Sequence, residues 1–267
     1  MKKHKICKIL LVILAIFLCV AFYELLGICV AYKKQPEVSN TTKKETKNGS
    51  WNECSENTER AVIIEKNPEA LLQRVRLIKN AKKEIILSTF AFQSDESGKL
   101  ILGALHDAAD RGVHIRLLVD GMESWVDMEG NPYFYGLSSH ENVEIKLYNK
   151  ANPLKPWKMM GRMHDKYLIA DGKRYILGGR NTYNYFLGDF PGHKNYDRDV
   201  LVVCDEPEKE NSVNQLLEYF ETIWEQEDSG YFHDNKKLAN RKSVKNAVLE
   251  LQNGYQKYFE ENKERIC

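Results

Sequence analysis

The chain is organised around the segment His164-Asp165-Lys166-Tyr167-Leu168-Ile169-Ala170-Asp171, followed after six residues by Gly178-Gly179-Arg180-Asn181. Because side chains alternate between the two faces of a strand, His164 and Lys166 are expected to project together on one side. The strand-like runs 167–170 and 174–177 flank Asp171-Gly172, a dipeptide that favours a tight hairpin. The second arm of this hairpin should return Gly178 to Asn181 to the level of His164.

The spacing HxK(x)4D(x)6GGxN resembles the signature (HKD motif) of the phospholipase D superfamily. With the aromatic pair Tyr185-Phe186 that follows, the Gly-Gly-Arg-Asn ending looks most like the first half of a bacterial cardiolipin synthase. The resemblance extends over about Arg60 to Gly230. It implies a phospholipase D-like α/β fold that carries one HKD half.

Apolar periodicity in the rest of this region agrees with an α/β fold. Asn67 is expected to cap the first helix, with Pro68 in its first turn. Because strands and helices alternate, we expect a mixed, mainly parallel sheet flanked by helices. The predicted strands are 61–64, 84–92, 113–119, 143–148 and 200–203, and the later helices are 98–111 and 211–226.

The resemblance also implies the chemistry of the site. His164 is expected to be the nucleophile that forms a covalent phosphohistidine. Lys166 and Asn181 are expected to bind the non-bridging phosphate oxygens, one as a charge and the other as a neutral donor. Gly178 and Gly179 permit a sharp bend and a close approach of the backbone to phosphate.

Of four further positions, three are open to two interpretations. Asp171 belongs to the motif, but the chemistry of a hairpin turn also accounts for it. Many relatives carry Ser where this chain has Gly179, so a hydroxyl contact is absent here. Asp197 matches the carboxylate that relatives place against the nucleophilic imidazole, with Asp199 as the alternative. Arg162 is either an additional phosphate ligand or a solvated loop arginine.

The sequence contains a single HxK(x)4D motif. Relatives with this mechanism use two, because one histidine attacks and the second protonates the leaving group. We therefore expect either a homodimer or a partnership with a second HKD-bearing half. A strict monomer is expected to be nearly inactive.

The N-terminal region predicts a membrane segment. Four lysines within residues 2–8 precede the run Ile9–Tyr32, which is apolar except for Glu24 and long enough to cross a bilayer of roughly 30 Å. A signal-anchor helix is the preferred interpretation. A cleaved signal peptide ending near Cys29-Val30-Ala31 and a buried core helix are the alternatives.

These patterns divide the chain into four parts: 1–32, a cytoplasmic stub and transmembrane helix; 33–59, a polar linker; 60–232, the catalytic domain; and 233–267, a helical tail. The basic start favours a single-pass protein of the cell membrane with its catalytic domain on the extracytoplasmic side. Lysines that follow the apolar run weaken this charge asymmetry.

Composition limits the partners. The formal net charge is +1, from 39 basic and 38 acidic residues, so no global basic field argues for nucleic acid. The six cysteines form no cluster with zinc spacing, and we expect neither a metal nor a cofactor.

The sequence thus favours a membrane-anchored, metal-independent phosphatidyltransferase or phosphodiesterase resembling cardiolipin synthase, with phosphatidylglycerol-type phospholipids as substrates. A homodimeric endonuclease with one HKD motif per chain is the first alternative. A non-catalytic half of a split enzyme is the second.

Overall fold

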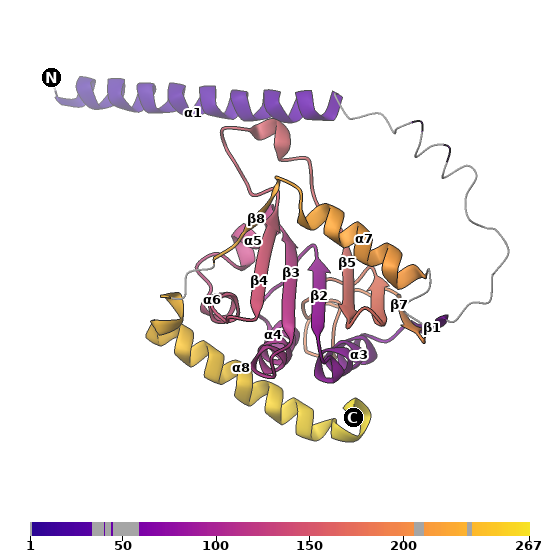
Figure 1. The fold of residues 1–267 in the computed structure, drawn as a ribbon. Helices are drawn as coiled ribbons and strands as arrows, with labels where there is room; N and C mark the ends of the chain where they lie inside the picture. Colours follow the sequence, from indigo (N-terminus) through magenta and orange to yellow (C-terminus); the bar gives the residue numbers. More distant parts are fainter. Residues whose placement is uncertain (1, 34–39, 41–43, 45–58, 206–210, 234–236) are drawn as a thin grey trace. The chain divides into compact units, whose positions relative to one another are not determined.

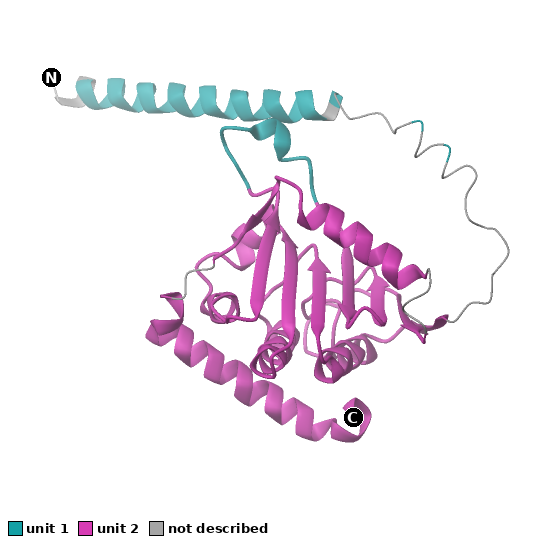
Figure 2. Cartoon of the chain, viewed as in Figure 1, with its two compact units in different colours: residues 1–57, 151–162 teal, residues 58–150, 163–267 magenta. Residues whose placement is uncertain are grey.

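The computed structural model describes residues 2–33, 40, 44, 59–205, 211–233 and 237–267. Most of the predicted linker 33–59 lies outside the described residues. The chain forms two compact units, which Figure 2 colours separately. Unit 1 comprises Met1–Asn57 and Ala151–Arg162, and unit 2 comprises Thr58–Lys150 and Met163–Cys267.

Unit 2 is built on an eight-stranded sheet with the order β1-β7-β6-β5-β2-β3-β4-β8 (Figure 1). The strands are β1 (Glu59–Ile64), β2 (Glu84–Thr89), β3 (His114–Asp120), β4 (Val143–Tyr148), β5 (Lys166–Ala170), β6 (Arg174–Gly178), β7 (Asp199–Cys204) and β8 (Ser229–Tyr231). The sheet is mixed, as predicted, but only β2-β3 and β3-β4 are parallel pairs. The expectation of mainly parallel pairing was wrong, because β5, β6, β7 and β1 form an antiparallel succession.

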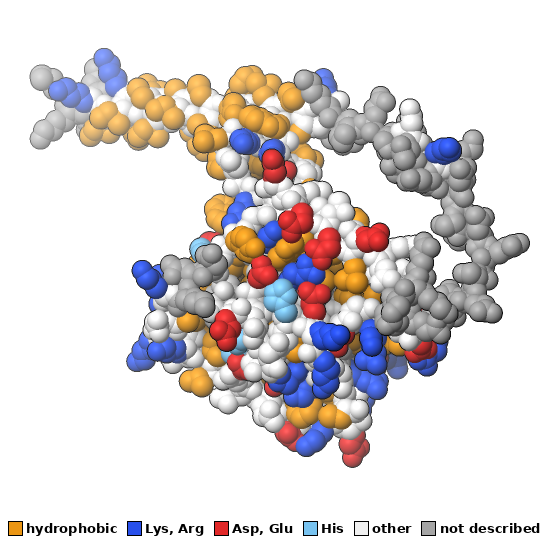
Figure 3. Space-filling model, viewed as in Figure 1, with side chains coloured by type: hydrophobic (Ala, Val, Ile, Leu, Met, Phe, Trp, Pro, Cys, Tyr) orange, Lys and Arg blue, Asp and Glu red, His pale blue; other side chains and the backbone are white. Residues whose placement is uncertain are grey.

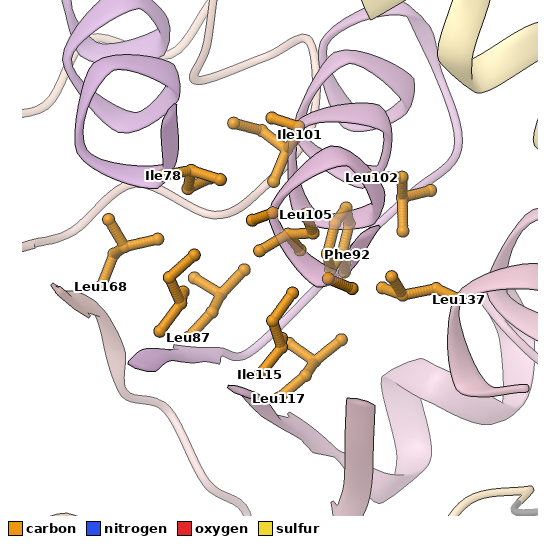
Figure 4. Packing of buried hydrophobic residues seen from close by; sticks show 14 of the residues in the cluster. Ile78, Leu87, Phe92, Ile101, Leu102, Leu105, Ile115, Leu117, Leu137 and Leu168 are labelled. Atoms are coloured by element: carbon orange, nitrogen blue, oxygen red, sulfur yellow. The ribbon is translucent and has the colours of Figure 1, made fainter. Parts of the chain in front are cut away.

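Helices cover both faces of this sheet (Figure 1). One face packs on α3 (Asn67–Asn80) and α4 (Glu96–Asp110), and Figure 4 shows Ile78, Ile101 and Leu105 from these helices meeting Leu87, Ile115 and Leu168 from the sheet. The opposite face of the sheet, with side chains such as Ile86, Leu118 and Ile169, packs on α7 (Ser212–Trp224). Both faces of the central strands are therefore buried.

The remaining helices complete unit 2. The tail forms α8 (Lys242–Glu261), which packs on α4 and on α6 (Pro132–Ser138). Shorter elements are α5 (Gly121–Asp127), η2 (Leu238–Asn240) and α9 (Lys263–Ile266). The short strand β8 and the helices α5 and α6 were not predicted from the sequence.

The predicted hairpin is confirmed. β5 and β6 are antiparallel, and Tyr167 pairs with Leu177, which brings Gly178 level with Lys166. Asp171 and Gly172 both have positive φ, at 55° and 61°, and Lys173 N donates to Ala170 O at 3.1 Å. This is the turn type that an Asp-Gly dipeptide favours.

The predicted cap of the first helix was wrong. Helix α3 is preceded by Lys66 and has no side-chain cap, with Pro68 in its first turn as expected. The buried side chain of Asn67 instead donates to Tyr185 O at 3.3 Å and to Asn195 O at 2.9 Å. Asn67 therefore serves a long-range contact rather than its own helix.

Unit 1 contains the long helix α1 (Lys2–Lys33) and the short 3-10 helix η1 (Pro156–Lys158). The 27 residues Lys5–Ala31 are long and apolar enough to cross a membrane. Figure 3 shows hydrophobic side chains along most of the visible surface of α1.

Candidate active site

The segment Phe90–Gln93, which directly follows β2, connects the two parts of the HKD motif. Thr89, the last residue of β2, pairs with Lys166, the first residue of β5. A few residues later Phe92 forms a parallel bridge to Thr182, and Gln93 N donates to Thr182 O at 3.2 Å. The end of β2 therefore lies between the His-x-Lys segment and the Gly-Gly-Arg-Asn segment.

Phe90 contacts two candidate residues of the motif, His164 and Lys166. Its ring centroid lies 4.7 Å from that of His164 in an edge-on arrangement, and 5.3 Å from Lys166 Nζ. Lys166 Nζ also donates to the backbone carbonyl of His164 at 2.6 Å. His164 is exposed, whereas Lys166 is only 5% exposed. An accessible imidazole therefore stands beside a buried ammonium.

Burial makes the ammonium of Lys166 easier to deprotonate. Desolvation lowers the pKa of its ammonium below the ordinary lysine value, and the carboxylates of Asp165 and Asp197 oppose this shift. An ammonium has three hydrogens, and the His164 carbonyl takes one of them. The others remain to bind an anionic oxygen.

Asn181 is fixed from two sides. Its Oδ1 accepts from Ala91 N at 3.3 Å, and the side chain is 7% exposed. Desolvation raises the pKa of the Tyr183 hydroxyl, and a side-chain hydrogen bond from Asn181 opposes that shift. Because an amide carries two N–H hydrogens, one remains available to a phosphate oxygen.

The two glycines of the motif lie against two carboxylates. An ideal Cβ on Gly178 would lie 2.0 Å from Asp199 Oδ1, and one on Gly179 would lie 2.0 Å from Asp197 Oδ2. Neither position has space for a side chain while the aspartates stay in place. Asp197 is therefore held next to the Gly-Gly-Arg-Asn segment and acts electrostatically on Lys166.

Asp199, the alternative partner for the imidazole, is engaged elsewhere. Its side chain is fully buried, and Oδ2 lies 2.9 Å from Arg74 Nη1 and 3.3 Å from Arg180 Nη1. The geometry therefore favours Asp197 over Asp199 as the carboxylate that serves His164. Its role in orienting the imidazole stays a prediction.

Arg180, the variable residue of the Gly-Gly-x-Asn pattern, ties this segment to the start of α3. Its buried guanidinium donates to Ile64 O at 3.2 Å, to Glu65 O at 2.5 Å and to Asn67 Oδ1 at 3.2 Å. Desolvation lowers the pKa of Arg180, and Asp199 opposes this most strongly. The sequence analysis did not single out Arg180 or Arg74, and it assigned Asn67 only to a helix cap.

Asp120 holds the backbone of the residue that precedes His164. This buried residue ends β3, and its Oδ1 accepts from Met122 N at 3.0 Å and Glu123 N at 3.2 Å at the start of α5. Its Oδ2 accepts from Met163 N at 3.1 Å. Asp120 and Phe90 both lie at the carboxyl end of a parallel strand, where functional side chains of α/β proteins gather. That position at a strand end is the feature by which a sequence analysis could have found both residues.

Asp171 lies away from the other motif residues. It is five residues beyond Lys166 along β5, about 17 Å at the rise of a strand. Its carboxylate accepts from Lys82 N at 2.9 Å, Lys83 N at 2.7 Å and Glu84 N at 3.1 Å. These bonds fix the turn against the start of β2 and give Asp171 a structural role, and its catalytic role stays a prediction.

Arg162, the remaining candidate, closes the segment of unit 1 that precedes the motif. Its role as a phosphate ligand stays a prediction. Among the described residues no group of three or more His, Cys, Asp or Glu side chains has an arrangement that would hold a metal ion. The candidate residues of the site are His164, Lys166, Asn181 and Asp197, and their chemical roles stay predictions.

Comparison with solved structures identifies proteins with a similar fold. The chain superposes on NucT from Helicobacter pylori with a TM-score of 0.50 and 18% identity, covering 65% of this chain and 99% of that one. It superposes on phosphatidylserine synthase from Haemophilus influenzae Rd KW20 with a TM-score of 0.52 and 18% identity, covering 73% of this chain and 43% of that one. Both likenesses concern the fold alone.

Sequence comparison gives the family. An uncharacterized protein of Helicobacter pylori (strain J99) is 31% identical over 206 residues, 72% of this chain and 38% of the relative. Cardiolipin synthase C of Escherichia coli (strain K12) is 29% identical over 171 residues, 59% of this chain and 34% of the relative. The chain thus spans about a third of the length of these relatives. The family model described as cardiolipin synthase, PLD-like domain, matches residues 74–224. The chain therefore belongs to the phospholipase D superfamily, in its cardiolipin synthase-like branch.

Proposed function

We propose that the chain is a membrane-anchored phosphatidyltransferase that acts on phosphatidylglycerol-type phospholipids. The observation that carries the proposal is the gathering of His164, Lys166 and Asn181 around Phe90 and Ala91 at one end of the sheet. The match to a cardiolipin synthase family model supports a phospholipid substrate. Helix α1 supports a single-pass anchor, and its basic start favours an extracytoplasmic catalytic unit.

In the proposed first step, an imidazole nitrogen of His164 attacks phosphorus, and the bond from phosphorus to the leaving alcohol breaks. Lys166 and the amide of Asn181 stabilise the non-bridging oxygens, which gain charge in the transition state. Asp197 stabilises the imidazolium form of His164. A phosphohistidine results, and the departing alkoxide takes a proton from an acid.

The second histidine of a paired motif would supply that proton, so the proposal includes a homodimer or a second HKD-bearing half. In the second step an acceptor alcohol attacks phosphorus, the bond from phosphorus to His164 breaks, and the conjugate base of that acid takes the proton of the alcohol. Water in place of the alcohol would give hydrolysis through the same intermediate. Residues of this chain provide the positive charge, so the proposed mechanism uses no metal.

One observation favours a second candidate function, a homodimeric endonuclease. The sequence has one HKD motif per chain, which suits a symmetric dimer that acts on one phosphodiester. The near balance of 39 basic and 38 acidic residues counts against a nucleic-acid groove, because phosphate contacts depend on an excess of Lys and Arg. The transferase remains the better supported proposal.

The deciding experiment incubates the detergent-solubilised full chain with phosphatidylglycerol in excess chelator, and single-stranded DNA is the parallel substrate. Cardiolipin and glycerol formed by the wild type but not by His164→Ala would support the proposal. DNA cleavage without lipid turnover would replace it with the nuclease function. If neither substrate reacts, the proposal that this chain alone is a transferase is contradicted. That result would favour an enzyme that needs a second half.

A further inference from the structure

The segment Ala151–Arg162, inserted between β4 and β5, has the composition of a membrane-surface element. It carries Lys155, Lys158 and Arg162 and contains no Asp or Glu. Two of its large apolar side chains are strongly exposed, Leu154 at 78% and Met160 at 52%, and Trp157 is 45% exposed. A short cationic segment that displays Leu, Trp and Met is unusual as the surface of a soluble loop.

This segment packs on α1 within unit 1. Pro156 lies so close to Gly27 that an ideal Cβ on Gly27 would meet Pro156 Cγ at 2.4 Å. The Tyr23 hydroxyl donates to the backbone carbonyl of Leu154 at 3.0 Å. Gly27 is buried, whereas the apolar side chains of Leu25 and Leu26 are exposed. The absence of a side chain at Gly27 therefore permits the contact.

The place of this contact along α1 matters. With a rise of about 1.5 Å per residue, Tyr23 and Gly27 lie about 22 and 28 Å along the axis from Lys8. The hydrocarbon core of a bilayer is roughly 30 Å thick. If the basic N-terminus marks one surface, the contact lies at the opposite boundary, where Trp and Tyr are enriched.

We infer that the segment Ala151–Arg162 binds the surface of an anionic bilayer beside the end of α1. Leu154, Trp157 and Met160 enter the boundary between headgroups and acyl chains, and Lys155 and Lys158 contact anionic headgroups. His164 follows Arg162 by two residues, a reach of at most about 7 Å. The surface segment and the proposed nucleophile are therefore neighbours along the chain.

This inference rests on the proposed membrane span of α1, and tryptophan fluorescence tests it separately because α1 contains no tryptophan. The full chain is reconstituted in vesicles of phosphatidylcholine and phosphatidylglycerol in which the phosphatidylcholine carries bromine near the headgroup end of its acyl chains. Brominated lipid is expected to quench the wild type, and Trp157→Phe should lose most of that quenching. Trp125→Phe is the matched control, since Trp125 is exposed in unit 2 and should contribute little.

Quenching of Trp157→Phe equal to that of the wild type would overturn the inference. A double variant, Lys155→Gln with Lys158→Gln, tests the headgroup contacts. Its quenching should fall in vesicles with phosphatidylglycerol and stay unchanged in phosphatidylcholine alone, and an equal response in both would overturn the anionic part. Extraction with alkaline carbonate reports on α1 independently. A chain that resists extraction without Trp157 quenching would retain the proposed anchor and refute the surface segment.

Discussion

The carboxylate of Asp197 fills the space beside Gly179. An ideal Cβ at position 179 would lie 2.0 Å from Asp197 Oδ2 and 2.5 Å from its Cγ. A serine there would fit only if this carboxylate turned away. Gly179 and Asp197 are therefore a matched pair in this chain, and Asp197 in turn acts on the charge of Lys166.

Gly179→Ala tests this pairing. The new methyl group displaces the end of a flexible side chain, so the melting temperature should change little while kcat falls by about tenfold or more. The control is Gly254→Ala in α8, where an added Cβ would meet nothing within 4 Å. Steady-state turnover of phosphatidylglycerol measures the effect. Unchanged kcat in Gly179→Ala would contradict the assigned role of Asp197.

Arg180→Lys should lower stability. Lysine cannot reproduce the planar guanidinium that bonds Ile64 O, Glu65 O and Asn67 Oδ1, and it leaves buried acceptors unpaired. We expect a loss of about 2–4 kcal/mol in the free energy of unfolding, measured with urea.

The matched control is Arg198→Lys. Arg198 pairs with Glu65 at 3.0 Å, but its side chain is 73% exposed. Its replacement should cost less than about 1 kcal/mol. Equal losses in the two variants would show that the buried network around Arg180 adds no stability of its own.

Asp171→Asn separates structure from catalysis. Asparagine tolerates the positive φ of 55° but offers one carbonyl oxygen where the carboxylate accepted from three N–H groups. Stability should fall by about 1–2 kcal/mol with kcat retained. His164→Ala should do the reverse, because the imidazole is exposed. A loss of kcat without a loss of stability in Asp171→Asn would support its catalytic role instead.

Lys166 should make stability and activity respond oppositely to alkaline pH. Its lowered pKa means that the native state releases the proton before the unfolded state does. Between that lowered pKa and the ordinary value of about 10.4 the unfolded state binds more protons, so this group makes stability rise with pH. The ammonium is lost over the same window, so kcat should fall.

Lys166→Met provides the comparison for this window. The difference in urea-unfolding free energy between wild type and variant should shift in favour of the wild type as pH rises. The variant should be inactive at every pH, since methionine provides no charge for phosphate. If the difference in unfolding free energy between wild type and variant stays constant across the alkaline range, the pKa of Lys166 is not lowered in the native state.

Subunit mixing tests the shared site. If each site takes one histidine from each of two chains, a mixed pair of wild type and His164→Ala lacks either the nucleophile or the acid. Activity should then fall as the square of the wild-type fraction once the subunits have exchanged. A linear decline would mean that one chain carries a complete site.

The sequence predicted the parts of this structure that depend on neighbouring residues. The β5–β6 hairpin followed from Asp171-Gly172 and the strand-like runs on each side. The amphipathic stripes predicted α3, α4 and α7 within a few residues. Strand pairing was less predictable, because the direction of β5 beside β2 depends on the path of the chain between them.

Long-range contacts account for what the sequence did not predict at the site. Asn67 is a residue type that favours helix caps, and only its long-range contacts with Arg180, Tyr185 and Asn195 show its actual use. Phe90 is one of ten phenylalanines, and nothing adjacent to it indicates that it contacts His164. Asp171 has the motif spacing of a catalytic residue, but the five extended residues from Lys166 place it at the far end of β5.

The position of β1 at the edge of the sheet has a consequence for synthesis of the chain. β1 pairs with β7, and its residue Arg60 meets Asp205, 145 residues later. At roughly 5–20 residues per second, a ribosome needs about 7–30 s to make the intervening chain. Throughout that interval β1 has no partner strand, and its Val62 and Ile63 are exposed even after pairing. The first strand to leave the ribosome is thus among the last to join the sheet, so a nascent chain at this stage is a natural substrate for a chaperone.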